Sequence, residues 1–234
     1  MSDRHSAFDR VGAVAGLVAV VLLLALFTVF PTLPAPNHSL EDIVRRADEN
    51  RTGLLLAAYV GALVTCALIV FGTALALRVR RSAPADDGWW VLAVAAVAAS
   101  SVGLAGNGLE IMFVRAVGHG VRGDALWVGY GADHWLTTLA AVPLAVFIFA
   151  IVRGGADRVQ PRWLVRLGGV VAALLLVGAA SVAGGEVDGG PLGIVLLLGY
   201  FGLIVWVGGA SVAILRHGAL VPPARTAGLG GLQP

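Results

Sequence analysis

Four residues of one apolar stretch could form a polar track along a membrane-spanning helix. Ser100, Gly103, Asn107 and Glu110 follow one another at spacings of three, four and three, so they share one face of an α-helix. Polar groups are costly in lipid and usually face the interior of a helix bundle. The functional hypothesis is a track ending in the Glu110 carboxylate, which could exchange a proton or bind a cation. The structural alternative is that the small residues permit close packing, while Glu110 reaches the outer headgroups.

Asp133 and His134 stand at the expected beginning of the next apolar stretch, on the same side of the membrane as Glu110. Because one loop joins the two stretches, a pair between Glu110 and His134 could act as a proton relay or a pH-sensitive latch. The candidate ion site therefore comprises Asn107, Glu110, Asp133 and His134. The alternative is a histidine with a structural or interfacial role.

Three histidines on that side, His38, His119 and His134, could supply nitrogen ligands to a divalent metal. They show no fixed spacing of the H-E-x-x-H kind, so they are weak candidates. An outer-face metal enzyme stays open on this basis, as the least supported of the functions considered.

The sequence lacks the residues that several other kinds of site would require. Haem held by two histidines needs a second His at the same depth in the membrane, and the apolar stretches contain none to pair with His134. The chain has no G-x-S-x-G motif and no lysine for a phosphate-binding loop. The single cysteine, Cys66, can form no intrachain disulfide. We therefore expect no catalytic residue and no cofactor, and we favour a protein without enzymatic activity, with the metal enzyme kept as an alternative.

The composition explains where these residues must sit. Of the 234 residues, 58% are hydrophobic and 13% are charged, against roughly 25% charged in soluble domains. Crossing the hydrocarbon core takes about 20 apolar residues in a helix. Six stretches meet or nearly meet that length: 11–30, 53–77, 89–114, 135–152, 163–183 and 191–215. The sequence predicts an all-α fold, a polytopic transmembrane bundle of six spans forming one domain over residues 1–216. A disordered cytoplasmic tail is expected over 217–234.

The arginines predict the orientation. All 16 basic residues are Arg, and eleven of them lie on the side that holds both chain ends, against five on the other side. Loops rich in Arg stay in the cytoplasm, so we expect both termini inside and the chain in a bacterial cytoplasmic membrane. The net charge is only +2 and the arginines gather at span ends, which argues against nucleic acid as a partner. The first apolar stretch is longer than a signal-peptide core, so we expect it to be retained as an anchor.

Two outer loops have features of their own. Ser39 followed by Glu41 and Asp42 is typical of a helix N-cap with acidic residues in the first turn. Apolar residues then recur at helical spacing, which predicts a short amphipathic helix over about 39–50 lying on the outer membrane surface. The loop over 116–133 is rich in glycine and is expected to be flexible or partly re-entrant.

Four short segments carry a resemblance to known proteins. They are Val159-Gln160-Pro161-Arg162-Trp163-Leu164 before the fifth stretch, Ile204-Val205-Trp206-Val207 with Ile214-Leu215-Arg216 in the sixth, and Asn50-Arg51-Thr52-Gly53 after the outer helix. In this layout the chain resembles the uncharacterised multi-pass membrane proteins of actinobacteria. The resemblance implies the topology, and it carries over no activity and no functional residue.

Two main hypotheses for the function follow. The scarcity of ionisable groups within the spans favours an accessory or interaction subunit without catalysis, whose partners are the lipid bilayer and either another membrane protein or a second copy. The alternative is a small proton- or cation-coupled transporter that uses Glu110 near the outer leaflet.

Overall fold

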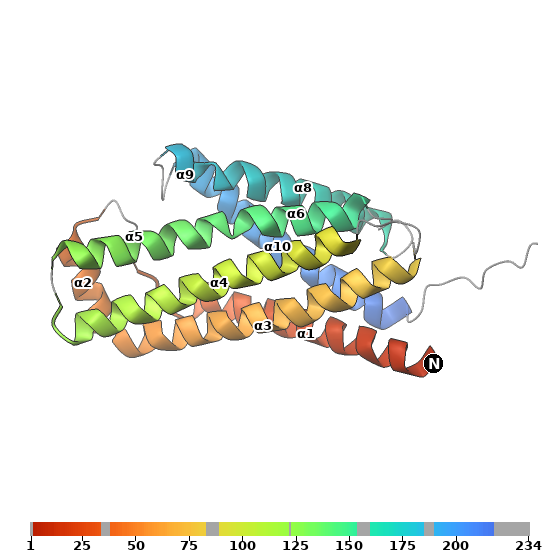
Figure 1. Ribbon diagram of the computed structural model, residues 1–234, viewed down its shortest axis with the longest axis horizontal. Helices are drawn as coiled ribbons and strands as arrows, with labels where there is room; N and C mark the ends of the chain where they lie inside the picture. Colours follow the sequence, from red (N-terminus) through yellow and green to blue (C-terminus); the bar gives the residue numbers. More distant parts are fainter. Residues whose placement is uncertain are drawn as a thin grey trace, which may run out of the picture.

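The computed structural model of the chain describes residues 2–33, 38–82, 89–121, 123–153, 160–184 and 190–217, and within these ranges every regular element is a helix (Figure 1). The helices are α1 (Ser2–Thr28), α2 (Leu40–Glu49), α3 (Arg51–Ser82), α4 (Trp89–Gly118), α5 (Asp124–Leu139), α6 (Ala141–Arg153), α8 (Arg162–Ala179), α9 (Ser181–Gly184) and α10 (Pro191–His217). The predicted all-α class is confirmed.

Six membrane-crossing segments, by length and apolar composition, are found in the described part of the chain. They are α1, α3, α4, α5 with α6, α8 and α10. Each packs against the segment before it and the segment after it, and α1 also packs against α10. The spans therefore form a closed ring, in the order of the sequence, in which α1 fills the place between α3 and α10. Large apolar side chains such as Val97, Phe149 and Val205 point out of the ring, where lipid is their natural solvent.

The fourth span is broken in its middle. Helix α5 ends at Leu139, α6 begins at Ala141, and Pro143 stands in the first turn of α6. Proline has no backbone N–H and its ring clashes with the carbonyl four residues earlier, so it cannot continue the hydrogen-bond ladder of α5. Pro143 therefore accounts for the break of the fourth span at Ala140.

The hairpin of α4 and α5 extends beyond the predicted apolar stretches. Helix α4 continues to Gly118 and α5 already begins at Asp124, so most of the glycine-rich loop is helical. The turn between them is short, and it uses glycine where φ is positive, at Gly120 (77°) and Gly123 (96°). In consequence Glu110 and Asp133 lie well inside the helices, each about 12–14 Å along the axis from the helix end at this turn.

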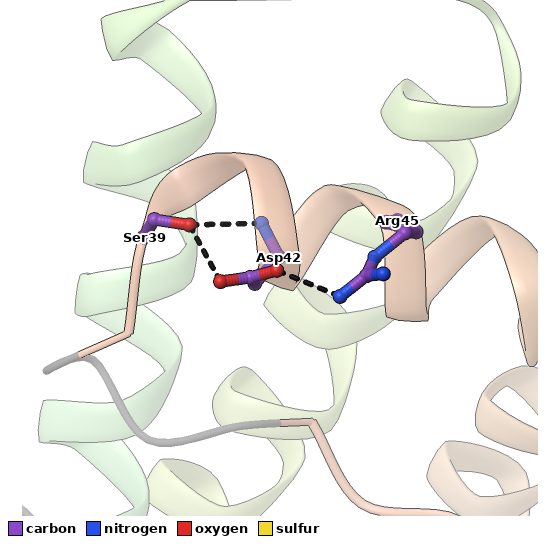
Figure 2. A network of polar contacts seen from close by, with 3 residues as sticks. All are labelled: Ser39, Asp42 and Arg45. Atoms are coloured by element: carbon purple, nitrogen blue, oxygen red, sulfur yellow. Dashed lines mark hydrogen bonds and ion pairs between the residues drawn. The ribbon is translucent and has the colours of Figure 1, made fainter.

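Helix α2 has the N-cap that the sequence predicts. The Ser39 hydroxyl accepts the Asp42 backbone N–H at 3.2 Å and donates to the Asp42 carboxylate at 2.8 Å, and Arg45 pairs with the same carboxylate at 2.7 Å (Figure 2). The predicted position on the membrane surface is corrected, because Ile43 and Ala47 are completely buried against protein. They pack with apolar residues of α3, α4 and α5, so α2 covers the end of that hairpin at the turn between α4 and α5 (Figure 1).

Glycines allow the closest helix approaches. A Cβ placed on Gly178 of α8 would lie 2.5 Å from the Leu196 Cα of α10, so the two backbones nearly touch there. On α1, Gly12 meets Ala74 of α3, while Gly16 meets Ser211 of α10. Small residues four apart on one face are the usual means of close packing between membrane helices, and here they seat α1 between its two neighbours.

Candidate functional site

A cavity of about 220 Å³ lies inside the ring. Its walls come from α1, α3, α4, the α5–α6 span and α10, and the lining residues of α3, α4 and α10 fall near the middle of those helices. The broken fourth span contributes residues from both sides of the break, including Thr137, Ala140 and Leu144. The cavity therefore lies near the centre of the membrane-crossing region, beside the break.

One wall of the cavity is polar. Three of the four residues of the predicted track, Ser100, Gly103 and Asn107, line it, together with Thr65 of α3. The Thr65 hydroxyl donates to the Gly61 carbonyl at 3.0 Å, and Ser100 likewise donates to the carbonyl one turn earlier at 2.7 Å. The hydrogen of each hydroxyl is thus engaged within its own helix. The two oxygens can still accept a hydrogen bond from a molecule in the cavity.

Asn107 differs from its polar neighbours. Among the described residues no hydrogen bond to its amide is formed, so its two N–H donors and its carbonyl face the cavity without a protein partner. Its position depends on Gly61, because a Cβ there would lie 2.5 Å from the Asn107 Oδ1. Close packing between α3 and α4 therefore holds the Asn107 amide in place, and its polar atoms are available to a ligand.

A polar contact joins the fourth span to α10. The Tyr200 hydroxyl of α10 donates to the Thr137 carbonyl at 3.1 Å, and the Thr137 hydroxyl donates to the Asp133 carbonyl at 3.0 Å. Both Thr137 and Tyr200 line the cavity. A broken span beside a cavity is a recurring feature of solute and ion sites in membrane transporters.

Two carboxylates follow the cavity on the side of the turn between α4 and α5. A Cβ on Gly106 would lie 3.5 Å from the Asp133 Oδ1 and 3.0 Å from the Thr137 Oγ1, which places Asp133 against α4 one turn before Glu110. Glu110 and Asp133 are both partly buried. Neither forms an ion pair with any residue that the structure describes. An uncompensated pair of this kind favours a bound proton or cation.

The structure therefore divides the four predicted site residues. Asn107 lines the cavity, whereas Glu110 and Asp133 are absent from its lining and follow it on the side of the turn between α4 and α5. His134 is absent from the cavity lining; its ring lies edge-to-face on Trp135 at 6.0 Å between centroids, and its backbone carbonyl accepts the Thr138 hydroxyl at 3.1 Å.

The three candidate metal ligands are not brought into one cluster. His38 and His119 are exposed, and the described ranges contain no group of three His, Cys, Asp or Glu side chains that could hold a metal ion. The geometry gives the hypothesis of an outer-face metal enzyme no support.

The opposite end of the bundle holds an ion cluster that the sequence did not reveal. Asp9 of α1 pairs with Arg78 of α3 at 3.4 Å and also with Arg81. The side chains of Asp9 and Arg78 are only 15% and 9% exposed. Because α1 and α3 are joined by a long loop, no spacing rule could have paired these residues; the cluster fastens the Arg-rich end of α1.

Several cavity residues were also missed. Thr65, Thr137 and Tyr200 are single polar residues in apolar stretches, and nothing in one sequence shows which of them face inward. Pro143 did give a usable signal, since a proline inside a span marks a break.

No protein-family model, curated protein or solved structure matches the chain. The resemblance to uncharacterised multi-pass proteins of actinobacteria stays a prediction, and the function must be argued from the geometry.

Proposed function

We propose that this multi-pass membrane protein is a small transporter that carries a solute through the central cavity and couples its movement to a proton or cation on Glu110 and Asp133. The observation that carries the proposal is the position of the cavity: it lies at mid-helix depth, beside the broken fourth span, with the carboxylate pair directly outward.

The chemistry of each part of the site indicates its role in transport. The unpaired Asn107 amide and the acceptor oxygens of Thr65 and Ser100 orient the solute within an otherwise apolar cavity. The two carboxylates repel each other while both are ionised, so binding one proton or one cation relieves that repulsion. The break at Ala140 gives the fourth span a point at which it can bend and so change access to the cavity.

We place the Arg-rich end, with both termini, in the cytoplasm of a bacterial plasma membrane, so the carboxylates lie on the outer side of the cavity. The competing proposal is an accessory subunit that binds another membrane protein or a second copy and carries nothing. The two differ in whether water reaches the cavity.

Thiol labelling tests the proposal without knowledge of the solute. Cys66 is exposed on the surface of the bundle, so it is first replaced by serine. The substitution Asn107→Cys is then introduced into that background. A carrier that opens alternately to each side predicts that a membrane-impermeant thiol reagent labels this variant in right-side-out vesicles and also in inside-out vesicles.

Leu104→Cys in the same background is the matched control, because Leu104 lies on α4 and is exposed on the outer surface of the bundle. Lipid shields that position, so we expect no labelling from either side. An Asn107→Cys variant that stays unlabelled from one or both sides would contradict the carrier and favour the accessory subunit.

A further inference from the structure

The cavity is long and narrow. Its lining follows α3 from Gly61 to Phe71 and α4 from Ala96 to Asn107, in each case at helical spacing. Ten residues of helix correspond to about 15 Å of rise. An engineered apolar cavity of about 150 Å³ holds one benzene molecule. The cavity here, at about 220 Å³, therefore has room for about nine non-hydrogen atoms, extended along the helices rather than gathered into a ring.

One end of the cavity is polar. A Cβ on Gly61 would lie 2.5 Å from the Asn107 Oδ1, so α3 and α4 meet there at the amide. Thr65 follows Gly61 by one turn, and the Tyr200 hydroxyl of α10 lies near the same level because it bonds the Thr137 carbonyl. This polar end is the one nearer to the turn between α4 and α5.

The other end is apolar and aromatic. The rings of Phe71 and Trp206 meet edge-to-face with centroids 6.3 Å apart, and both residues line the cavity. Phe147 joins them, since its ring would lie 3.2 Å from a Cβ on Gly72. Polar and apolar ends about 15 Å apart suit a molecule with a polar head and an apolar chain.

The lining excludes an ion. None of the lining residues carries a charge, and Glu110 and Asp133 are absent from the lining. A charge that enters an apolar cavity without a partner loses its hydration and gains nothing in return. The molecule that fits this cavity is therefore uncharged.

The hydrogen bonds at the polar end select the head group. The Thr65 hydroxyl donates to the Gly61 carbonyl and the Tyr200 hydroxyl donates to the Thr137 carbonyl, so both oxygens are left as acceptors. The Asn107 amide offers two N–H donors and one acceptor. A hydroxyl group can accept from Asn107 and donate to one of these oxygens, whereas an ether or ester oxygen can only accept.

We propose that the solute is an uncharged primary alcohol on a single unbranched chain of about eight carbons. Its hydroxyl lies against Asn107 and its chain extends to the aromatic end of the cavity. This inference rests on the proposed function and names the substrate class of the same site.

Photolabelling of the purified full-length protein in lipid nanodiscs tests the inference. The probe is 1-octanol with a diazirine on its third carbon, and mass spectrometry of peptides locates the adducts. We expect adducts on residues that line the cavity, and excess 1-octanol should suppress them.

An isomer of the competitor tests the head group. 1-Methoxyheptane has the same atoms as 1-octanol, but its oxygen has no hydrogen to donate. We expect it to need about fivefold or more higher concentration for equal suppression, since one hydrogen bond is missing. An ether enters lipid at least as readily as the alcohol, so weaker competition reflects the site.

The variant Asn107→Leu removes the amide and keeps a side chain of similar size. In this variant the two isomers should compete within about twofold of each other, whereas Leu104→Ala, at an exposed position on the same helix, should keep the fivefold difference. If Asn107→Leu does not fold, the comparison of the two isomers on the wild-type protein still decides.

Adducts that lie outside the cavity, or equal competition by the two isomers in wild type, would overturn the alcohol as the solute. Labelling of Asn107→Cys from both sides would then leave the transporter standing, and its absence would overturn the transporter as well. If the alcohol competes as expected while Asn107→Cys stays unlabelled from one side, the cavity is a fixed binding site and only the transporter fails.

Discussion

At the scale of single residues, burial without a partner distinguishes a site from a structural contact. The Asp42 carboxylate on α2 has both a hydroxyl and a guanidinium beside it, and Asp9 on α1 pairs with two arginines. Glu110 and Asp133, by contrast, form no ion pair with any residue that the structure describes. The first two carboxylates hold helices in place, whereas the pair retains its capacity to bind something.

The Ser39 cap can be tested by titration. The hydrogen bond from Ser39, and then the neighbouring Arg45, hold the pKa of Asp42 below its ordinary value. The ionised carboxylate therefore stabilises the start of α2 above the ordinary pKa of an aspartate, and this stabilisation is lost as the pH falls through the lowered pKa. We expect Ser39→Ala to raise the pKa of Asp42 in a carbon-detected NMR titration, and Ser39→Thr, which keeps the hydroxyl, to leave it low. An unchanged pKa in Ser39→Ala would show that Arg45 alone sets it.

The Asp9 cluster predicts a loss of stability. Removing one partner of a buried ion pair leaves the other charge uncompensated, at a cost of about 3 kcal/mol in a well-buried case. Because Asp9 is 15% exposed, we expect about 1–3 kcal/mol for Asp9→Ala, measured by chemical unfolding in mixed micelles. Asp48→Ala, at an exposed position on α2, should change the free energy of unfolding by less than about 0.5 kcal/mol. Equal effects of the two changes would mean that the Asp9 cluster does not hold α1.

At the scale of elements, glycines and one proline decide how the helices meet. Pro143 divides the fourth span beside the cavity, and Gly61 makes room for the Asn107 amide. Gly178 lets α8 approach α10 to backbone contact. These residues have little or no side chain to contribute, so their effect lies in the geometry that they permit.

Two glycines of α8 form a matched pair for testing this packing. A Cβ on Gly178 would meet the Leu196 backbone, whereas a Cβ on Gly169 would meet nothing within 4 Å. We expect Gly178→Ala to destabilise the protein by about 1–3 kcal/mol, the usual cost of overpacking, because backbone must shift. Gly169→Ala should be neutral or slightly stabilising. Thermal unfolding of both variants in detergent measures the difference, and similar midpoints would show that α8 and α10 are not in close contact at Gly178.

At the scale of the whole molecule, the six spans close into a ring because α1 packs against both α3 and α10. Residues of α1, Leu23 and Leu26, line the cavity, so the first span completes its wall. The Asp9 cluster fastens one end of this span, while α2 covers the outer end of the α3–α4–α5 side.

The orientation predicts which ends an external reagent reaches. In the Cys66→Ser background, His119→Cys lies at the turn between α4 and α5, and Arg216→Cys lies near the end of α10; both positions are exposed. With both termini inside, an impermeant thiol reagent added to intact cells should label His119→Cys and leave Arg216→Cys unlabelled until the membrane is opened. The reverse pattern would invert the topology and move the carboxylate pair to the cytoplasmic side.

The residue pattern alone was enough to predict the spans and α2, because continuous apolar stretches have no other stable state in lipid and the Ser39 cap is a local interaction. It also determined that Ser100, Gly103, Asn107 and Glu110 share a face, since that depends only on helical period. The position of α2 could not be foreseen, because an amphipathic helix buries its apolar face equally well in lipid or against protein.

Which residues face that polar track depends on how the spans assemble. The ring brings Thr65 and Tyr200 to the same cavity as Asn107, and the α4–α5 hairpin sets Asp133 against α4 at Gly106, one turn before Glu110. Contacts between helices depend on how the spans rotate and approach, and those quantities are fixed by packing summed over the whole ring. The polar track was therefore readable from residue spacing, whereas the cavity and the carboxylate pair exist only once all the spans are assembled.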